Sequence, residues 1–314
     1  MWTIIQGHPE ALPLVVGALR SVAEADGGPS EDQRAWIAEL ARRNGGGVGL
    51  DEAPVPTAEA LGRALPEADA RRRLLRQLVL VALADQTLSE AEVERVETWA
   101  RALGVQHPAV AALRLHLRGR IRALAIQVSR RSFVASLFKA IWRQDGLPGL
   151  WRALVAAARV PSRTTAARYQ ALAELPEGTL GRELHDHCRR NGFAMPGERR
   201  GTPEILLFHD LGHTLTGFGT DGPGEVQMAG FEAGFMGGDD AFSITEFGMY
   251  AFGLGAHIIP NQPTKGGDFS ALAFIEAYAL GEHLDLDLRY WSPWPSIDRP
   301  MAQVRAELGL PAAA

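Results

Sequence analysis

The sequence has very little cysteine and very little lysine. Its 314 residues include one cysteine, Cys188, which excludes an intrachain disulfide framework and a zinc site made of four thiolates. Only Lys139 and Lys265 are lysines among the 32 basic residues, so arginine carries nearly all of the positive charge. A single arginine is therefore weak evidence for function here. The cysteine content predicts a reducing compartment.

Long apolar runs are also absent. The longest, Leu78 to Ala84, is far shorter than the roughly 20 residues that a membrane-spanning helix needs. The first ten residues lack the basic region and apolar core of a signal peptide. Hydrophobic residues make up 46% of the chain, which is enough to bury a core, and its length suggests two domains. We expect a soluble, cytoplasmic protein.

Charge is distributed unevenly along the chain. Residues 1–113 carry 11 basic and 16 acidic side chains, and residues 169–314 carry 9 basic and 20 acidic ones. Between them, residues 114–168 carry 12 basic side chains and one acidic residue, Asp145. A basic segment of this kind can meet an anionic membrane, a nucleic acid or an acidic protein.

The basic segment also has the pattern of amphipathic helices. Phe133, Leu137, Phe138 and Ile141 recur at helical spacing, and a further helix is expected over residues 151–160. Basic helices with aromatic residues can lie in a membrane interface, or they can connect domains with their apolar faces in the core. We predict peripheral contact with the inner face of a membrane. The segment has no helix-turn-helix, zinc-finger or RNP pattern, so no nucleic-acid partner is predicted.

The N-terminal third contains an internal repeat. Ala25-Asp26-Gly-Gly-Pro-Ser30-Glu31 returns 59 residues later as Ala84-Asp85-Gln-Thr-Leu-Ser89-Glu90. Apolar residues at helical spacing flank both copies, and Ser30 and Ser89 are expected to be helix N-caps. Each copy therefore predicts a helix, an acidic turn and a second helix. Neither copy can bury its apolar face alone, so the two are expected to form one helical domain.

Residues 10–105 resemble the tellurite-resistance TerB-like domain, an all-helical module with paired aspartate-containing turns. The resemblance places the acidic positions of that family at Asp26 and Asp85, with Glu31 and Glu90 beside them. These acids either bind a metal or simply cap helices, whose positive N-terminal ends favour carboxylates. The resemblance implies an interaction module, and one function to consider is a stress-response adaptor.

Two histidines and two acids near residue 210 form the strongest chemical motif. His209 and His213 are four residues apart, so both imidazoles share one face of a helix, and Asp210 can reach the same side. A glycine-rich loop separates them from Glu225, which begins another helical segment. Neutral imidazoles and carboxylates are ligands of zinc, iron and manganese. We expect a divalent metal here, with zinc favoured.

Three alternatives compete with this interpretation. A zincin protease needs glutamate in the second position of the motif, where this chain has Asp210. A phosphohydrolase of the His-Asp type needs another histidine upstream and a later aspartate. Two buried, hydrogen-bonded histidines would need no metal, but they would not explain the nearby acids.

The complete motif, His-Asp-x-x-His followed after eleven residues by Glu, resembles the signature of the ubiquinone (coenzyme Q) biosynthesis family called coenzyme Q protein four. Residues 175–182, 191–193 and 299–310 also resemble segments of that family, so the resemblance spans about 130–314. It implies that His209, Asp210, His213 and Glu225 bind the metal in an all-helical domain.

The same resemblance implies an activity and partners. Family members act on polyprenylated benzoate or quinone intermediates at a membrane face, and they are associated with removing the ring C1 carboxylate and with organising other ubiquinone-biosynthesis enzymes. A metal-dependent decarboxylase is the favoured function, and a non-catalytic lipid-binding scaffold is the alternative. Residues 247–254 and 271–280 are expected to line an apolar groove for the isoprenoid tail.

Other polar residues near the motif have separate predicted roles. Glu232 lies two helical turns after Glu225, so it either faces the site as the candidate catalytic acid or lies in solvent. His185, His187 and Cys188 are expected at the surface, because neighbours on a helix point in different directions.

The predicted fold is all-α, with two helical domains joined by basic amphipathic helices. The predicted boundaries give a TerB-like repeat domain at 1–113, basic connecting helices at 114–168 that belong with the C-terminal domain, and a metal-binding domain at 169–314.

Overall fold

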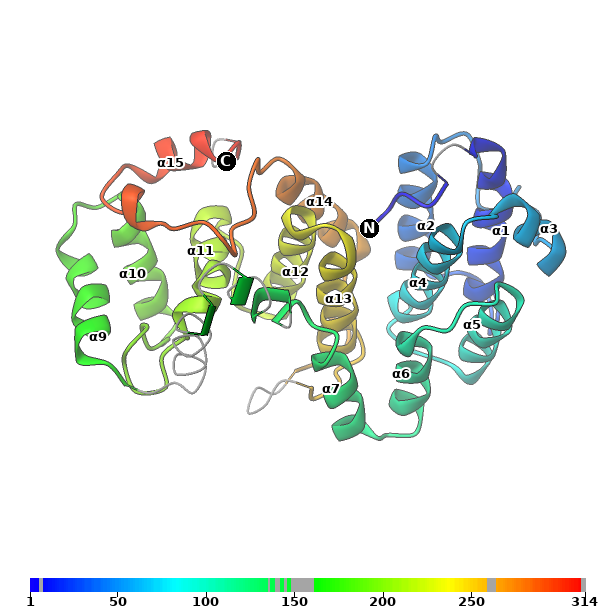
Figure 1. Ribbon diagram of the computed structural model, residues 1–314, viewed down its shortest axis with the longest axis horizontal. Coiled ribbons are helices and arrows are strands. Elements are labelled where there is room, and N and C mark those ends of the chain that lie inside the picture. The colour runs from blue at the N-terminus through cyan, green and yellow to red at the C-terminus, as the bar shows by residue number, and fades with distance from the viewer. Residues whose placement is uncertain are drawn as a thin grey trace. The chain divides into compact units, whose positions relative to one another are not determined.

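The computed structural model describes residues 1–5, 8–134, 136–138, 142–143, 146–147, 161–258 and 264–311 (Figure 1). Over these residues the chain is helical and forms no sheet, which confirms the predicted all-α fold. An isolated β-bridge pairs Thr179 with Pro300. The helix predicted at 151–160 and the residue Ile141 lie outside the described residues.

The helices have the following bounds in chain order. The α-helices are α1 Leu12–Ala23, α2 Glu31–Arg43, α3 Ala58–Ala64, α4 Ala68–Ala84, α5 Glu90–Ala102, α6 Pro108–Leu117, α7 Ile121–Ser129, α9 Arg163–Gln170, α10 Leu180–Arg190, α11 Leu207–Thr216, α12 Gly222–Met236, α13 Gly238–Gly248, α14 Ala271–Glu282 and α15 Met301–Glu307. Short 3-10 helices occupy Pro9–Ala11, Ala171–Glu174, Glu204–Leu206 and Trp294–Ser296, and a π-helical turn occupies Met249–Gly253.

Packing divides the chain into two units. Unit 1 comprises Met1–Ser132 and Gly237–Glu276, and unit 2 comprises Phe133–Met236 and Ala277–Ala314. These units differ from the segments 1–113, 114–168 and 169–314 drawn from the sequence, because residues 237–276 pack with the N-terminal helices. The chain passes from unit 2 to unit 1 at Gly237 and Gly238, whose φ angles of 64° and 52° suit glycine.

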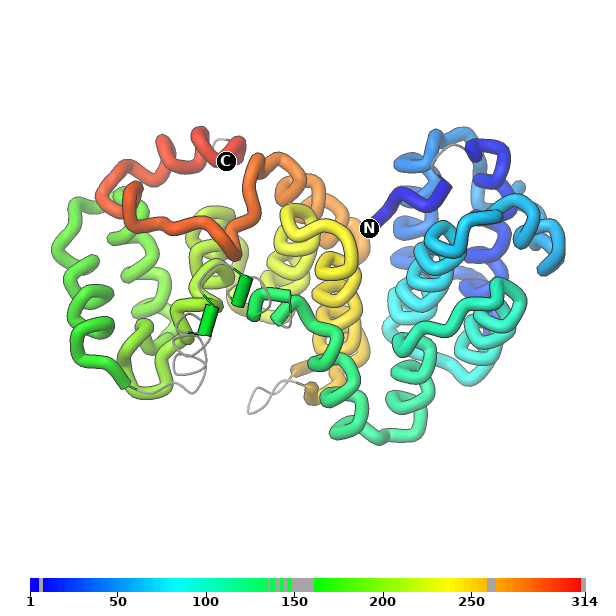
Figure 2. The backbone as a smooth tube through the Cα atoms, viewed as in Figure 1, coloured from blue at the N-terminus to red at the C-terminus, as the bar shows by residue number. Residues whose placement is uncertain are grey.

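The repeat forms the helical core of unit 1. Helices α1, α2, α4 and α5, coloured blue to cyan in Figure 2, pack on one another. Ser30 and Ser89 cap α2 and α5, each in a reciprocal capping box with the residue three positions later, which confirms both predicted N-caps. The apolar residues that the two copies share are buried: Leu19, Val22, Ile37, Leu40, Leu78, Val81, Val96 and Trp99.

The two copies also contact each other at equivalent positions. Gln33 and Glu92, the third residues of α2 and α5, are 59 residues apart, which is the offset of the repeat. The Gln33 side-chain amide donates a hydrogen bond of 2.9 Å to Glu92 Oε1 and another of 3.3 Å to the carbonyl of Val81. The third helical residues, which complete the two capping boxes, therefore contact each other inside the domain.

Helix α13 and the π-helical turn complete unit 1 by packing on α4. Arg76 of α4 forms an ion pair of 2.6 Å with Asp239, and Arg131 holds both oxygens of Glu246 at 2.8 and 2.9 Å. Met249, Tyr250 and the rest of the π-helical turn are buried in this packing. The side chains of 249–253 are therefore already covered within unit 1, and the apolar groove expected along 247–254 and 271–280 stays a prediction.

The basic segment begins in unit 1 with α6 and α7. Arg118, Arg120, Arg122 and Arg130 are exposed, and Ile126 keeps 55% of its surface exposed among them. No helix in the described ranges has both the length and the apolar character to cross a membrane.

Close helix contacts at glycine shape unit 2. A Cβ at Gly234 would lie 2.3 Å from the carbonyl oxygen of Tyr278, and one at Gly281 would lie 2.1 Å from the carbonyl oxygen of Phe231. These glycines let α12 approach the residues of α14 that belong to unit 2. The core of the unit is formed by residues of α10, α11, α12 and α15, including Leu184, Leu211, Phe231 and Val304.

Candidate metal centre

Helix α11 places His209 and His213 one turn apart on the same face, as their spacing predicts. Their rings meet edge to face with centroids 4.7 Å apart, and their Nε2 atoms are 3.2 Å apart. The helix ends at Gly217, whose φ of 79° allows the left-handed turn that stops it. Immediately after this turn, the carbonyl of Phe218 accepts a hydrogen bond of 3.1 Å from His213 Nδ1. The local sequence thus fixes the ring of His213.

Helix α12 brings two glutamates to the histidines. Asp221 caps its start, since its side chain accepts a hydrogen bond of 3.1 Å from the backbone of Gly224. Gly212 of α11 leaves room for Met228 of α12, because a Cβ there would lie 2.4 Å from the Met228 methyl carbon. This close crossing sets Glu225 and Glu232 beside the face that carries the histidines.

Three potential ligand atoms converge at this crossing. Glu225 Oε2 lies 3.4 Å from His209 Nε2, and Glu225 Oε1 lies 3.6 Å from His213 Nε2. His209, His213 and Glu225 form a group whose ligand atoms all lie within 4.8 Å of one another. Zinc bonds of about 2.0–2.1 Å in a tetrahedron place neighbouring ligand atoms about 3.3–3.4 Å apart. The two Nε2 atoms are 3.2 Å apart and each lies near a different oxygen of Glu225, at spacings close to that value, so the two imidazoles and the carboxylate can surround one metal and leave a fourth position open.

The outer nitrogens of both histidines are already engaged. His209 Nδ1 lies 2.8 Å from Glu232 Oε1, and His213 Nδ1 donates to the Phe218 carbonyl. An acceptor at Nδ1 favours the tautomer that keeps the proton there and leaves the Nε2 lone pair free. Carboxylate and carbonyl acceptors behind imidazole ligands are typical of protein metal sites. The two histidines are therefore oriented for coordination through Nε2.

The carboxylates and imidazoles of the group stabilise one another's charged forms. Burial acts to raise the pKa of Glu225, but its hydrogen bonds to His209 and His213 and their charges outweigh burial and bring it to about 2. Burial acts to lower the pKa of His209, but the charge of Glu232 and the hydrogen bonds to Glu225 and Glu232 hold it well above its ordinary value. Without a metal, the group therefore contains ionised carboxylate beside a protonated imidazole.

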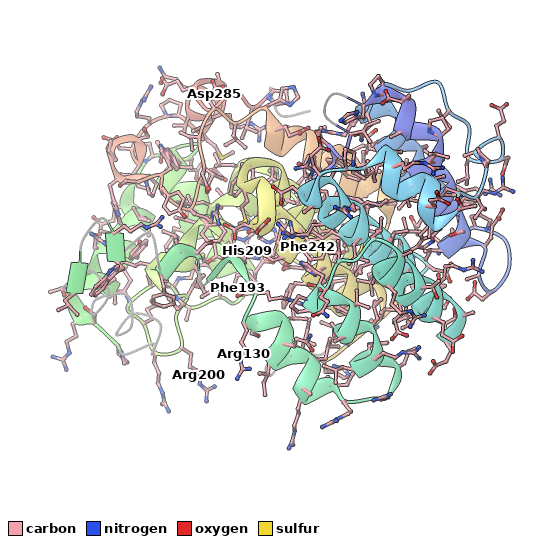
Figure 3. The ribbon with its side chains drawn as sticks, turned by 45° about the vertical axis from the view of Figure 1, so that its right-hand side comes forward. Arg130, Phe193, Arg200, His209, Phe242 and Asp285 are labelled. Atoms are coloured by element: carbon pink, nitrogen blue, oxygen red, sulfur yellow. The ribbon has the colours of Figure 1, made fainter. Side chains whose placement is uncertain are left out.

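Solvent reaches the group at His209. Its side chain is 36% exposed, whereas those of Glu225 and His213 are 15% and 1% exposed. Figure 3 labels His209 of α11 and Phe193 of the loop after α10. A small molecule can therefore approach the group from the side of His209.

Asp210 lies outside this three-residue group. It is buried, burial raises the pKa of its carboxyl group, and its hydrogen-bond partner is the Thr202 side chain. Residues adjacent on a helix are about 100° apart around its axis, so Asp210 faces a different neighbour from His209. The predicted set of four ligands is thus represented by three converging side chains, and metal coordination by Asp210 stays a prediction.

Glu232 faces the group, as one of the two sequence-based alternatives proposed. It is buried, and the polar contact that places it is the one to His209 Nδ1. From this position Glu232 orients the ring of His209. A catalytic role for Glu232 stays a prediction.

The structure corrects the prediction for residues 185–188. His187 and Cys188 were expected at the surface, but they are 7% and 1% exposed. They lie on the side of α10 that packs against α11. The His187 ring is nearly parallel to that of His213, at an angle of 16° with centroids 5.5 Å apart. The strong amphipathic pattern of α10 was the signal that could have identified this buried side.

A second group of potential ligands lies in unit 1. Asp26, Asp85 and Glu92 have carboxylate oxygens within 4.8 Å of one another. Asp26 and Asp85 were predicted from the repeat, whereas Glu92 takes the place that was expected for Glu31 and Glu90. Burial, followed by the charges of Asp26 and Asp85, raises the pKa of Glu92 to about 7.

Comparison with known families agrees with part of these predictions. Residues 55–115 match the family model of the tellurite resistance protein TerB, so the N-terminal part contains a TerB domain. The match begins before α3 and covers the second copy of the repeat, α5 and most of α6. No curated protein matches the chain significantly. The resemblance of residues 130–314 to the ubiquinone-biosynthesis family remains a prediction.

Proposed function

We propose that the protein binds a divalent metal, with zinc favoured, through His209, His213 and Glu225, and uses it on a polyprenylated benzoate or quinone intermediate of ubiquinone-type lipid biosynthesis. The observation that carries the proposal is the convergence of the two histidine Nε2 atoms and the Glu225 carboxylate, with both histidine Nδ1 atoms already bonded. The resemblance of the motif to the ubiquinone-biosynthesis family implies these three ligands together with Asp210, and it also implies the substrate class.

The proposed reaction removes the carboxylate from ring C1 of the benzoate. The bond from C1 to the carboxylate breaks, carbon dioxide leaves, and a hydroxyl group forms at C1. Dioxygen is the oxidant, and a two-electron donor reduces its second oxygen atom to water. A bound divalent metal supplies a positive charge that binds and polarises the substrate carboxylate or phenol. His209 and His213 hold that charge in place, and Glu232 keeps His209 oriented.

We also propose that the protein contacts an anionic membrane surface, where a polyprenylated substrate resides. The exposed Arg118, Arg120, Arg122 and Arg130 in and around α7 and the exposed Ile126 support this contact, because basic charge and apolar side chains together favour an anionic interface. Other enzymes of the pathway are the proposed protein partners.

Metal content tests the centre directly. The purified full-length protein is expected to contain about one metal per chain by elemental analysis, and His213→Ala is expected to lose it. His283→Ala is the matched control, since His283 follows the end of α14, is exposed, and bonds the backbone carbonyl of Ala279 in that helix. Negligible metal in wild type, after purification without chelators and reloading with zinc, iron or manganese, would overturn the proposal.

Substrate turnover tests the reaction. With dioxygen and a two-electron donor supplied, a prenylated 4-hydroxybenzoate labelled in the carboxyl group is expected to release labelled carbon dioxide with wild type and with His283→Ala, but not with His213→Ala. Metal-loaded wild type that releases none, although it binds the lipid, would leave the non-catalytic scaffold as the better function.

The scaffold alternative rests on the basic surface. It predicts that the His213→Ala protein still binds vesicles containing phosphatidylglycerol, whereas replacing Arg118, Arg120 and Arg122 with glutamine abolishes binding. The measurement is co-sedimentation of the full-length chain with vesicles at low and high salt.

An adaptor led by the TerB domain is a further candidate, favoured by the family match at 55–115 and by the acidic group. It predicts that Asp26→Asn with Asp85→Asn removes the biological response to tellurite or oxidant stress in cells, while the metal at His213 stays bound. An unchanged response would remove this candidate.

A further inference from the structure

His187 carries a buried polar atom that the proposed metal centre has not yet used. Its Nε2 atom is inaccessible to solvent and has no hydrogen-bond partner among the described residues. Buried polar atoms in folded proteins nearly always have a partner, so an orphaned one beside a ligand group is informative. The candidate partner is a molecule that enters the site.

The surroundings of His187 define which nitrogen carries the proton. The Asn191 side-chain amide donates a hydrogen bond of 2.9 Å to the His187 carbonyl and points the same NH₂ group at His187 Nδ1, 3.5 Å away. The Asn191 oxygen is fixed on its other side, where it accepts a hydrogen bond of 3.0 Å from the Thr220 hydroxyl. With a donor facing Nδ1, the neutral ring carries its proton on Nε2. The orphaned atom is therefore an N–H donor.

This donor lies next to the metal ligands. The His187 ring stacks over His213, and the charges of His213, His209 and Glu225 all act on it. Both Nδ1 atoms of the ligand histidines are bonded, and their Nε2 atoms face Glu225 and each other. The fixed groups of the centre therefore leave the His187 N–H without an acceptor, and an anion at the remaining metal position would supply one.

We propose that His187 donates a hydrogen bond from Nε2 to a carboxylate that occupies the remaining coordination position of the metal. The inference rests on the proposed function; it selects the carboxylate rather than the phenol as the metal-bound group and names the residue that recognises it. A carboxylate has two oxygens, so one can bind the metal while the other accepts from His187. The Nε2 proton also explains why His187 stacks on the ligand set without joining it.

Carboxylate binding to the cobalt-loaded protein tests this role without requiring turnover. Co²⁺ replaces the metal in the full-length chain, and benzoate is titrated while the visible absorption of Co²⁺ is recorded. His187→Phe keeps a flat ring but removes the N–H, so we expect benzoate affinity to fall about tenfold or more while Co²⁺ affinity changes less than about threefold. His187→Gln retains an N–H donor and is expected to recover part of the benzoate affinity.

His185→Phe is the matched control on the same helix, because His185 bonds Asp186 and is outside the ligand group. We expect it to bind Co²⁺ and benzoate as wild type does. Circular dichroism and thermal unfolding of each variant establish that it is folded before the titration.

The outcomes separate this inference from the metal centre itself. Equal benzoate affinity in wild type and His187→Phe would overturn the donor role while leaving the centre intact. Loss of Co²⁺ in folded His187→Phe would instead make His187 a metal ligand and also overturn the donor role. Wild type that takes up no Co²⁺ would overturn both proposals together. If His187→Phe does not fold, equal benzoate affinity in His187→Gln and a folded His187→Leu decides against the donor role.

Discussion

The described part of the chain contains two groups of potential metal ligands, and they differ in how their atoms are held. In the histidine group, each Nδ1 has an acceptor, and each Nε2 points toward Glu225. In the acidic group, the oxygens of Glu92 already accept hydrogen bonds from Ser89 and Gln33. In the first group both Nε2 atoms become available to a metal once His209 releases its proton, whereas in the second group the oxygens of Glu92 are partly used by a helix cap.

Electrostatics separates the two groups in the same way. His209 and His213 keep Glu225 ionised despite burial, so the group balances its charges before any metal arrives. Burial and the charges of Asp26 and Asp85 raise the pKa of Glu92 to about 7. Near neutral pH, a proton on Glu92 therefore relieves the repulsion among the three carboxylates. Proximity of potential ligands is therefore a weaker criterion for a metal site than the hydrogen bonds and protonation of the ligand side chains.

The largest expected effect is the loss of a charged ligand from the histidine group. Binding energies of about 10–16 kcal/mol for zinc shared by four ligands correspond to roughly 3 kcal/mol for each, so Glu225→Gln should weaken metal binding more than about a hundredfold. Competition with a chromophoric chelator measures the affinity. Asp85→Asn is the control from the acidic group and should change it less than about twofold. Equal losses in the two variants would break the distinction between the groups.

The second prediction concerns the proton on Glu92. Its pKa in the folded protein is about 7, above the ordinary value of 4.5, so the folded state holds this proton more tightly than the unfolded state. The resulting stabilisation is fully present below pH 4.5 and is lost as the pH rises through 7. Relative to Glu92→Gln, wild type should lose up to about 3 kcal/mol of unfolding free energy over that range.

Urea denaturation of wild type and Glu92→Gln at pH 4.5, 6 and 8 measures this difference. If the two proteins show the same dependence on pH, Glu92 is not the group responsible. Repeating the measurement with calcium tests the acidic group as a metal site, since bound metal would restore the stability of wild type at pH 8.

A smaller effect on metal affinity is expected from Glu232, which bonds Nδ1 of the ligand His209. Removing the charge that supports a ligand histidine typically weakens metal binding about 10–100-fold, so Glu232→Gln should fall in that range. Glu177→Gln is a control in the same unit, because Glu177 is exposed and distant in sequence from the centre. Chelator competition and circular dichroism are measured together. Unchanged affinity would show that Glu232 does not orient His209, and loss of turnover with unchanged metal affinity would support the predicted catalytic role.

The smallest effect tests the equivalence of the two repeat copies. Ser30→Ala and Ser89→Ala each remove a capping hydrogen bond and should each cost about 1 kcal/mol of unfolding free energy. Denaturant unfolding of both variants gives the comparison. A loss for Ser89→Ala several times larger than for Ser30→Ala would mean that the acidic group depends on its cap in a way that the first copy does not.

Local patterns in the sequence determined the parts of the protein that depend on spacing alone. The repeat, the capping serines and the shared face of His209 and His213 follow from helical periodicity and from side chains bonding to nearby backbone. Gly217 also acts locally, since its left-handed conformation ends α11 one residue before the carbonyl that holds His213. These features need no knowledge of distant segments.

Only the tertiary structure decided which helices supply the remaining contacts. Periodicity identifies the buried face of a helix but not the helix that covers it, so Glu232 was left between two alternatives, and the stacking of His187 on His213 could not be predicted. The place of Glu92 beside Asp26 and Asp85 likewise depends on how the two repeat copies pack. The assignment of residues 237–276 to unit 1 was equally inaccessible, because sequence order alone does not reveal that the chain returns to an earlier core.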